Sequence, residues 1–379
     1  MTKRLKLCVI GAGAMGSSYG GLLAKLGHEV LLVDRWSAHV EAINRDGLQL
    51  DGVCGQHRLA LTACQDVPDG LDADLAMIWT DTNNTRQAAL IAERALAAGG
   101  FAVTLQNGVG NVETLVEVLG QHRVLAGSSM CSAAMQGPAR AILTHMGMTS
   151  LGEIGGGSSP RVESLCQELK AAGFEVRAYP DIMSLIWTKF ALNCAINALC
   201  AATGLRLGEL ARTPAVDRLQ DHLIDEILAV IAAKGITLAD PDLRATVKAH
   251  CWGKFSRPSM LQAIEAGKAT EIDALNAQVV LAGLQLGIPT PYNDALVLLL
   301  KGVEHKASAA RGRTDADYAA LEAQVTGPHN LQRFIYAQAP VYRQAVAKLA
   351  AGENSGRSMW FVSPQLAGRG PVTWASRAA

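Results

Sequence analysis

Three polar side chains interrupt an apolar stretch at residues 186–203 and could take part in chemistry. Lys189, Asn193 and Asn197 recur every four residues, which would place them on one face of a helix. Burying such a group without a partner costs about 2–7 kcal/mol, so a helix seldom carries this stripe unless it faces a polar ligand. The alternative is a solvated face of a half-buried helix. A lysine in apolar surroundings has a lowered pKa and can donate a proton to a substrate oxygen that gains negative charge.

A glycine-rich loop near the N-terminus has the spacing of a dinucleotide-binding motif. Its six residues are Gly11, Ala12, Gly13, Ala14, Met15 and Gly16. A β-rich run at 6–10 precedes the loop and a helical stretch to Lys25 follows it, which is the context that the motif requires. Gly11 permits a tight turn, Gly13 lets the backbone approach a pyrophosphate, and Gly16 allows close helix–strand packing. Free N–H groups at the helix N-terminus would bind the phosphates, so we predict a dinucleotide site.

Two residues at the end of the second predicted strand, 29–34, bear on which dinucleotide binds. Asp34 lies 18 residues after Gly16, where a carboxylate accepts a hydrogen bond from a ribose 2′-hydroxyl and favours NAD. Its neighbour Arg35 could accommodate the 2′-phosphate of NADP, or it could be a solvated loop cation. The two residues give opposite indications, so they leave the choice of cofactor open.

Two further segments carry polar residues where ligands could bind. Asn107 follows a predicted strand at 101–105, and ligands of an open α/β sheet lie beyond the carboxyl ends of its strands. It could equally be a turn asparagine. In the second half, Ser259 could be a helix cap, and Glu271 could be a first-turn acid that opens a helix at 270–286. Each of these residues therefore has a functional and a purely structural interpretation.

The order of the predicted elements indicates two kinds of architecture. The expected strands cover 6–10, 29–34, 75–79, 101–105 and 174–178, and residues 139–156 also look strand-like. Strands that alternate with helices are typical of βαβ units and a parallel sheet. The expected later helices cover 181–202, 214–234, 240–251, 270–286 and 292–304. We predict an α/β dinucleotide-binding domain with a Rossmann-type doubly wound sheet at 1–179, an all-α substrate domain at 180–329, and a partly irregular C-terminal extension at 330–379.

The composition excludes several classes of partner. The 379 residues include 34 Lys and Arg and 34 Asp and Glu, and zero net charge argues against nucleic acid or an anionic membrane as the main partner. No run of about 20 uncharged apolar residues is present, so no membrane span is expected. The eight cysteines form no Cys-x-x-Cys pair, and none lies near a histidine at zinc-ligand spacing. We expect a cytoplasmic protein without a metal or disulfides and with a small-molecule ligand. A homodimer is compatible with these features.

Taken together, the motifs resemble those of the ketopantoate reductase family (2-dehydropantoate 2-reductase). The matching segments are the glycine loop at 11–16, Gln-Asn-Gly at 106–108, Lys-x₃-Asn-x₃-Asn at 189–197, Ser-Met-x-Gln at 259–262, Thr-Glu-Ile-Asp-x-x-Asn at 270–276 and Gly-Ile-x-x-Pro at 287–291. The resemblance covers about residues 5–305. The lysine–asparagine helix together with the Thr-Glu-Ile-Asp segment is specific to the family, whereas the glycine loop is not.

The resemblance implies reduction of a 2-oxo acid by hydride transfer from NADPH, most directly of 2-dehydropantoate to pantoate. Lys189 would donate a proton to the carbonyl oxygen, and Glu271 would be an acid that lies beside both the lysine and the cofactor. The implied substrate contacts are Asn107, Asn193, Asn197 and Ser259. The implied cofactor contacts are Asn107, Ala133 and Glu271, besides the glycine loop, Asp34 and Arg35.

Three positions depart from the family pattern. Asp81 stands where the family has a lysine on the cofactor side, a family asparagine falls near Leu207, and Ala263 stands where an acid is common. Together with Asp34, the acid at position 81 makes NADH a candidate cofactor beside NADPH. A family relative that acts on another 2-oxo or hydroxy acid is therefore an alternative. A non-catalytic dinucleotide-binding regulator is a further alternative, although it would not need Lys189.

Overall fold

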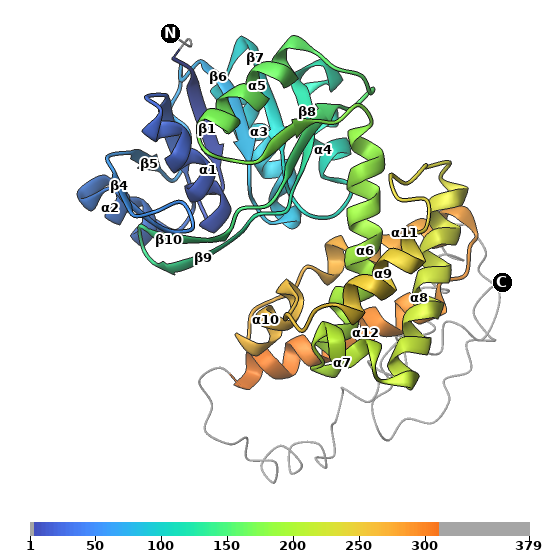
Figure 1. Cartoon of the computed structure of the whole chain (residues 1–379). Coiled ribbons are helices and arrows are strands. Elements are labelled where there is room, and N and C mark those ends of the chain that lie inside the picture. The colour runs from blue at the N-terminus through green and yellow to red at the C-terminus, as the bar shows by residue number, and fades with distance from the viewer. Residues whose placement is uncertain (1–3, 311–379) are drawn as a thin grey trace, which may run out of the picture. The chain divides into compact units, whose positions relative to one another are not determined.

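An eight-stranded sheet forms the centre of the N-terminal part of the chain in the computed structural model, which describes residues 4–310 (Figure 1). Its strand order is β12-β11-β8-β7-β6-β1-β2-β5. The strands are β1 (Lys6–Ile10), β2 (Glu29–Val33), β5 (Thr62–Cys64), β6 (Ala73–Ile78), β7 (Leu96–Thr104), β8 (Val124–Ser129), β11 (Thr149–Glu153) and β12 (Val176–Ala178). Within this sheet β8 and β11 pair antiparallel and the other neighbours are parallel. Because β1 lies between β2 and β6, the loop after β1 opens where the strand order reverses, which is where ligands of doubly wound sheets bind.

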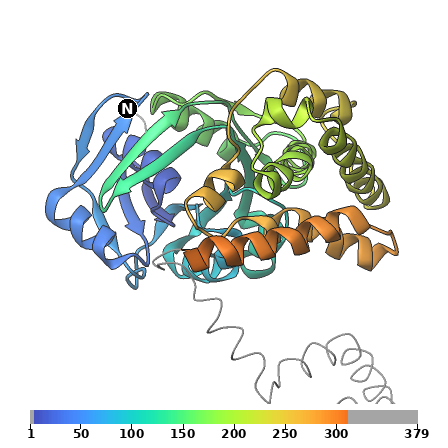
Figure 2. The same cartoon turned by 90° about the horizontal axis from the view of Figure 1, so that it is seen from below.

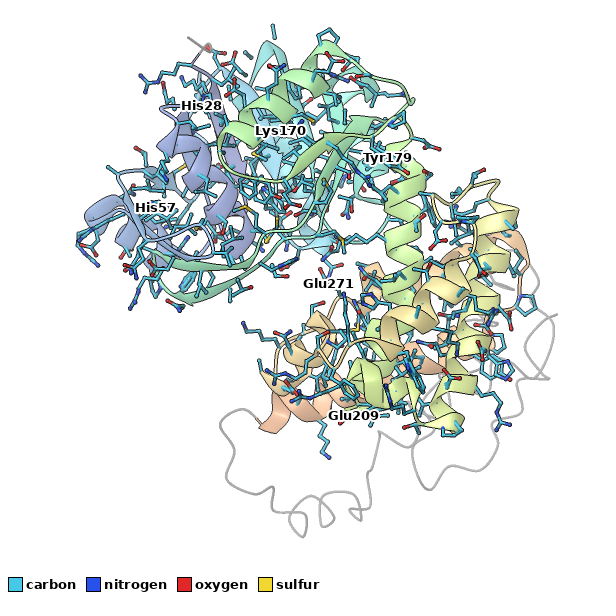
Figure 3. All side chains as sticks on the ribbon, viewed as in Figure 1. His28, His57, Lys170, Tyr179, Glu209 and Glu271 are labelled. Atoms are coloured by element: carbon cyan, nitrogen blue, oxygen red, sulfur yellow. The ribbon has the colours of Figure 1, made fainter. Side chains whose placement is uncertain are left out.

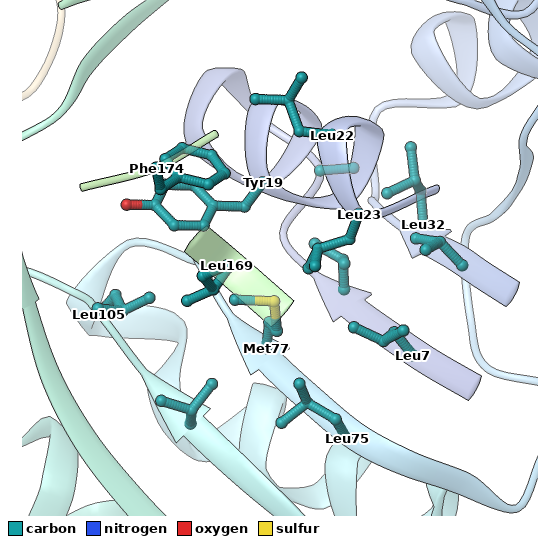
Figure 4. Packing of buried hydrophobic residues seen from close by; sticks show 14 of the residues in the cluster. Leu7, Tyr19, Leu22, Leu23, Leu32, Leu75, Met77, Leu105, Leu169 and Phe174 are labelled. Atoms are coloured by element: carbon teal, nitrogen blue, oxygen red, sulfur yellow. The ribbon is translucent and has the colours of Figure 1, made fainter. Parts of the chain in front are cut away.

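Helices bury the side chains on both faces of this sheet. They are α1 (Ala14–Lys25), α2 (Ser37–Asp46), α3 (Thr85–Ala95), α4 (Asn111–Leu119) and α5 (Pro160–Ala171), with 3₁₀ turns η1 (Thr82–Asn84) and η2 (Gln121–Arg123). Leu7 and Val9 of β1 point into the core cluster that α1, α2 and α5 share, which Figure 4 shows from close by. Cys8 and Ile10 point into the cluster formed with α3 and α4, as the period-2 alternation of a strand requires. The predicted doubly wound α/β sheet is therefore confirmed.

A second, four-stranded sheet packs against α1, and the strand patterns of the sequence do not separate it from the first. It has the order β4-β3-β10-β9, with β3 (Leu48–Gly52), β4 (His57–Leu59), β9 (Ser132–Gly137) and β10 (Arg140–His145). β10 pairs in parallel with β3, so that Arg140 lies opposite Gln49. His39 joins this sheet to the glycine loop, because its Nδ1 accepts from the N–H of Ala139 (2.9 Å) and its Nε2 donates to the carbonyl of Ala12 (2.9 Å).

Helices make up the described part of the chain after β12. They are α6 (Ile182–Thr203), α7 (Leu207–Ala211), α8 (Pro214–Ala233), α9 (Leu243–Trp252), α10 (Ser259–Glu265), α11 (Asn276–Leu286) and α12 (Pro291–Ala310), with the 3₁₀ turn η3 (Ile272–Ala274). α6 packs against α8, α9, α10 and α12 and is the central helix of this part (Figures 1 and 2). The predicted all-α architecture is confirmed here, and the predicted extension at 330–379 lies outside the described residues.

The apolar character of α6 reflects its central place among the other helices. Among the described residues, it is the one helix long and apolar enough to cross a membrane by length and composition, but 67% of its most apolar window is buried inside the structure. Such burial is typical of a core helix. It also means that any polar side chain on α6 has to find a partner or face an opening.

The predicted helix at 270–286 begins later than expected. α11 starts at Asn276, and Glu271 precedes the separate turn η3, so the prediction that Glu271 opens the helix is wrong. Leu275, which lies between the two elements, has φ −114° and ψ −104°, outside the helical region. Residues 270–273 hydrogen-bond to α12 through the backbone and side chains, and these tertiary contacts override the helical tendency of the sequence.

A buried polar network fixes the start of α12. Glu226 of α8 accepts hydrogen bonds from the backbone N–H groups of Tyr292 (2.8 Å) and Asn293 (2.9 Å), in the first turn of α12. Asn293 accepts from the Nδ2 of Asn276 (2.9 Å), which also donates to the carbonyl of Cys194 on α6 (2.9 Å). A carboxylate at a helix N-terminus is stabilised by the free N–H groups and the helix dipole. The network therefore fixes α12 relative to α8, α11 and α6.

Candidate active site

The three glycines of the loop between β1 and α1 have three different environments. Gly11 has φ +90°, and a Cβ there would lie 2.7 Å from the N of Thr80. A Cβ at Gly16 would lie 2.1 Å from the carbonyl oxygen of Gly11, so only glycine lets α1 approach the loop this closely. Around Gly13, by contrast, no atom of the described residues lies within 4 Å of such a Cβ. The open backbone at Gly13 leaves room for a phosphate group.

The N-terminus of α1 is suited to an anion. Gly13 is the N-cap residue, and no side chain of the described residues caps the helix. The peptide before it is fixed, because Ser17 Oγ (2.7 Å) and His39 Nε2 (2.9 Å) both donate to the carbonyl of Ala12. The first N–H groups of α1 are thus available to the phosphates of a dinucleotide. The residues of this loop fit such a cofactor.

A pocket opens beside the loop at the carboxyl ends of β1, β2 and β6. Its lining includes Gly11 and Gly13, the predicted cofactor residues Asp34 and Arg35, and also Asp81. The charges around the pocket are therefore those that the sequence analysis linked to the choice between NADH and NADPH.

Three polar residues of this pocket were not singled out from the sequence. Gln65 follows the three-residue strand β5, Asn84 lies in the turn η1, and Gln87 lies on α3. A three-residue strand and a single helical turn leave too short a pattern to be recognised, and none of the three belongs to a motif. The presence of polar side chains after a predicted strand was the one available signal.

Lys189 reaches from the helical part of the chain to the main sheet. Its Nζ donates a hydrogen bond of 2.6 Å to the carbonyl of Ser129, the last residue of β8. Burial lowers the pKa of the Lys189 amine to about 8, and the negative charge of Glu271 partly offsets this fall. An amine with such a pKa is protonated in a large fraction of molecules at neutral pH and can release the proton to a substrate.

Asn193 and Asn197 follow Lys189 on the same face of the continuous helix α6. Asn193 is half-buried, and Asn197 is only 9% exposed, so a solvated helix face does not explain Asn197. Within residues 4–310 neither side-chain amide forms a hydrogen bond. Two amides without partners beside a lysine amine are suited to binding a polar ligand.

Glu271 lies close to Lys189, Asn107 and Asp81, although these residues are far apart in the sequence. The pKa of the Glu271 carboxyl group is raised, chiefly by burial and also by the negative charge of Asp81. A hydrogen bond with Asn107 and the positive charge of Lys189 offset part of this rise. Figure 3 labels Glu271 on the side of the helical part that faces the α/β part. The chain therefore brings together an amine, an amide and two carboxyl groups from four separate segments.

The Gln-Asn-Gly turn after β7 holds Asn107 in this group. The Nε2 of Gln106 donates to the carbonyl of Thr80 (2.6 Å), which joins the turn to the loop after β6. Gly108 has φ +85°, and a Cβ there would lie 2.8 Å from the carbonyl oxygen of Ala274 in η3. Glycine therefore lets the turn approach the segment that carries Glu271. Asn107 occupies a turn and also contacts Glu271, so its two interpretations are compatible.

The remaining predicted residues lie on neighbouring elements. Ser259 is exposed and is the first residue of α10, which packs against α6; Pro258 is the N-cap, so Ser259 does not cap the helix. Ala133 is half-buried in β9, opposite Leu143. The ligand contacts of Ser259 and Ala133 stay predictions. Among residues 4–310, no group of three or more His, Cys, Asp or Glu side chains could hold a metal ion.

The fold and the site together define a class of protein. A glycine loop lies at the switch point of a doubly wound sheet, and a helical domain brings a lysine amine to the carboxyl end of a strand, as in nicotinamide-dinucleotide-dependent oxidoreductases. The chain belongs to the ketopantoate reductase family, because the family pattern described as ketopantoate reductase PanE/ApbA matches residues 7–156 and its C-terminal counterpart matches residues 181–304. Residues 328–379 match a different family, described as a protein of unknown function (DUF1810).

Individual relatives cover most of the chain. The 2-dehydropantoate 2-reductase of Archaeoglobus fulgidus is 31% identical over 297 residues, 78% of this chain and 97% of that protein. The crystal structure of a PanE/ApbA family ketopantoate reductase from Ralstonia eutropha JMP134 is 33% identical, covers 80% of this chain and 99% of its own, and has a TM-score of 0.73. The ternary structure of D-mandelate dehydrogenase with NADH and anilino(oxo)acetate is 27% identical, with the same coverage and a TM-score of 0.73. The resemblance that the motifs indicated is confirmed.

Gly16→Ala should weaken dinucleotide binding by roughly tenfold or more, because relieving an overpacked contact of this kind costs about 1–3 kcal/mol. The added Cβ would meet the carbonyl of Gly11 and displace the loop. Fluorescence titration with NADH and NADPH measures the effect. Gly99→Ala is the matched control, since no described atom lies within 4 Å of a Cβ there. Equal affinities of the two variants would show that the loop does not bind the cofactor.

Proposed function

We propose that this protein reduces a 2-oxo acid to a 2-hydroxy acid with NADH or NADPH, and that 2-dehydropantoate is its first candidate substrate. The observation that carries the proposal is the Lys189 amine, with a pKa lowered to about 8, held by a carbonyl beside two amides without partners among the described residues. Relatives named 2-dehydropantoate 2-reductase support the same reaction.

The residues of the chain would have separate tasks in this reduction. The amides of Asn193 and Asn197 bind the polar groups of the substrate. When bound, NADH or NADPH supplies a hydride equivalent to the carbonyl carbon. As negative charge grows on the carbonyl oxygen, Lys189 gives its Nζ proton to that oxygen, so that hydride and proton together convert C=O into CH–OH. The carbonyl of Ser129 and the carboxylate of Glu271 keep the amine in place and favour its protonated form before transfer.

A second candidate substrate class consists of 2-oxo acids with a larger apolar side chain. Leu207, near which the family pattern has an asparagine, is 3% exposed and donates its N–H to the carbonyl of Ser256 (3.4 Å), close to Ser259 in the chain. A leucine buried in the helical core offers no hydrogen bond to a polar group of the substrate, so an apolar substrate side chain loses nothing there. The similar ternary structure of D-mandelate dehydrogenase with NADH and anilino(oxo)acetate supports this alternative.

A substrate panel tests the proposal. We expect NADH or NADPH oxidation with 2-dehydropantoate, or with an aromatic 2-oxo acid such as phenylglyoxylate. The control compounds are the corresponding acids with CH₂ in place of the 2-carbonyl group, which should give no oxidation. The ratio of kcat/KM between the two oxo acids separates the two substrate classes. Absence of turnover with every 2-oxo acid, in either direction of the reaction, would contradict the proposed activity.

The proton donor gives a prediction of its own. Because the protonated amine is the active form, kcat/KM for reduction should fall as the pH rises through the Lys189 pKa of about 8. Lys189→Ala should lower kcat by roughly 10²–10⁴ and leave dinucleotide affinity nearly unchanged. The measurements are a pH–rate profile and a cofactor titration. A variant with the kcat of the wild type would remove Lys189 from the mechanism.

We also propose that the enzyme uses NADH at least as well as NADPH. Asp34 Oδ1 accepts from the N–H of Trp36 (2.9 Å), which fixes the carboxylate where it lines the pocket. A fixed carboxylate can accept from ribose hydroxyls and repels a 2′-phosphate. Asp81 adds a second negative charge to the same pocket, where the family has a positive one, and Arg35 is the one cation among the described lining residues that opposes both.

Asp34→Asn should shift the kcat/KM ratio towards NADPH by roughly fivefold or more, since one charge removed at about 4 Å is worth ~1 kcal/mol even in water-like surroundings. Asparagine keeps an oxygen that can accept from Trp36, so the loop should be preserved. Arg35→Ala is the opposite control and should disfavour NADPH. If the wild type strongly prefers NADPH and Asp34→Asn leaves the ratio unchanged, Arg35 sets the choice.

A further inference from the structure

The segment that carries Glu271 is held from one side by α12. Glu304 of α12 accepts two hydrogen bonds with the same carboxylate oxygen, from the backbone N–H and from the Oγ1 of Thr270, both at 2.6 Å. Thr270 Oγ1 in turn accepts from the N–H of Ile272 (3.2 Å). Hydrogen bonds to an ionised acceptor are stronger than neutral ones, so the residue directly before Glu271 is firmly bound to α12.

Lys301, one helical turn before Glu304, binds the same segment beyond Glu271. Its Nζ lies 2.5 Å from Oδ2 of Asp273 and 3.4 Å from Oε2 of Glu304. The side chain of Glu304 is only 14% exposed, which distinguishes this network from an isolated surface ion pair. Residues 270 and 273 are thus both tied to α12, and Glu271 lies between them.

On its other side the segment packs against the core and the Gln-Asn-Gly turn. Ile272 and Ala274 are buried, and the carbonyl of Ala274 lies so close to Gly108 that a Cβ there would be 2.8 Å away. The backbone that carries Glu271 therefore has little freedom while α12 keeps its contacts. The Glu271 side chain is the member of this segment that interacts with Lys189.

We propose that Glu304 and Lys301 are positioning residues, which hold residues 270–273 so that the Glu271 carboxylate stays beside the Lys189 amine. The inference rests on the proposed function, because it concerns the same lysine. Neither residue needs to touch substrate or cofactor, since each acts through the segment that it binds.

The contacts of Glu304 and Lys301 with residues 270–273 form a clamp, and loss of this clamp changes the proton affinity of Lys189. Glu271 and Cys131 are the neighbouring groups that affect the pKa of Lys189. Asn107, Asp81 and Lys189 are those that affect the pKa of Glu271. The carboxylate of Glu271 raises the pKa of Lys189 against the effect of burial. If Glu271 moves away, burial dominates and the pKa falls further below its ordinary value. Because the protonated amine is the active form, the alkaline limit of activity should move to lower pH.

Two variants of the full chain test this inference. Glu304→Gln keeps an oxygen acceptor but removes the charge. Thr270→Val removes the Oγ1 bond to Glu304, together with the bond from the Ile272 N–H, and keeps the backbone bond to Glu304. We expect the alkaline limb of kcat/KM to move down by about half a pH unit in Glu304→Gln and by less in Thr270→Val. Asp225→Asn, which breaks an exposed contact with Arg244 in the same helical part, is the matched control and should leave the profile in place.

A second measurement separates this inference from the proposed function. Acylation of Lys189 by a small amine-reactive reagent, followed by peptide mass spectrometry across a pH series, reports its titration without any turnover. If the wild type reduces no 2-oxo acid but the midpoint of Lys189 acylation is lower in Glu304→Gln than in the wild type, the clamp is supported and the proposed function is rejected. Unchanged midpoints and pH profiles in folded variants would overturn the clamp. If Glu304→Gln does not fold, the Thr270→Val result decides.

Discussion

The hydrogen bond between the Lys189 amine and the carbonyl of Ser129 is the interaction on which the candidate site depends. It is 2.6 Å long and joins α6, at the centre of the helical core, to the end of β8 in the main sheet. Burial of the amine favours its neutral form, whereas Glu271 favours the ammonium form. The balance puts the pKa at about 8. A proton donor for a carbonyl needs such a value, since a fully solvated lysine holds its proton too tightly.

The position of the Ser129 carbonyl is in turn fixed from the dinucleotide side of the sheet. Tyr19, on the helix that begins at the glycine loop, has its hydroxyl 2.9 Å from Ser129 Oγ and 2.6 Å from Thr149 Oγ1. Its ring stacks on Phe174 with centroids 4.0 Å apart (Figure 4). Burial raises the pKa of Tyr19 far above its usual range, so the hydroxyl remains a donor. The helix whose N-terminus would meet the phosphates thus also supports the strand end that holds the lysine.

The sequence could predict the parts of the site that depend on local periodicity. The glycine spacing at 11–16 and the lysine–asparagine stripe of α6 are local patterns, and the structure shows the environments that the glycine motif requires. The four-stranded sheet could not be predicted, because its central pairing places Arg140 opposite Gln49, and β5, β6, β7 and β8 of the main sheet lie between β4 and β9 in the chain. The start of α11 at Asn276 could not be predicted for a similar reason. Thr270 and Asp273 are bound by Glu304 and Lys301, and no local pattern contains those partners.

The charge at position 81 links the two halves of the reaction. Asp81 lines the pocket beside the glycine loop, where we propose that the dinucleotide binds, and its charge also raises the pKa of Glu271. Glu271 in turn stabilises the protonated Lys189. A lysine at position 81, as in the family pattern, would attract phosphate and hold Glu271 more firmly ionised, whereas aspartate repels phosphate and weakens that ionisation. In the proposed reaction one acidic side chain would therefore couple cofactor choice to proton donation, so a substitution at position 81 that changes the cofactor preference should also change the pH range of catalysis.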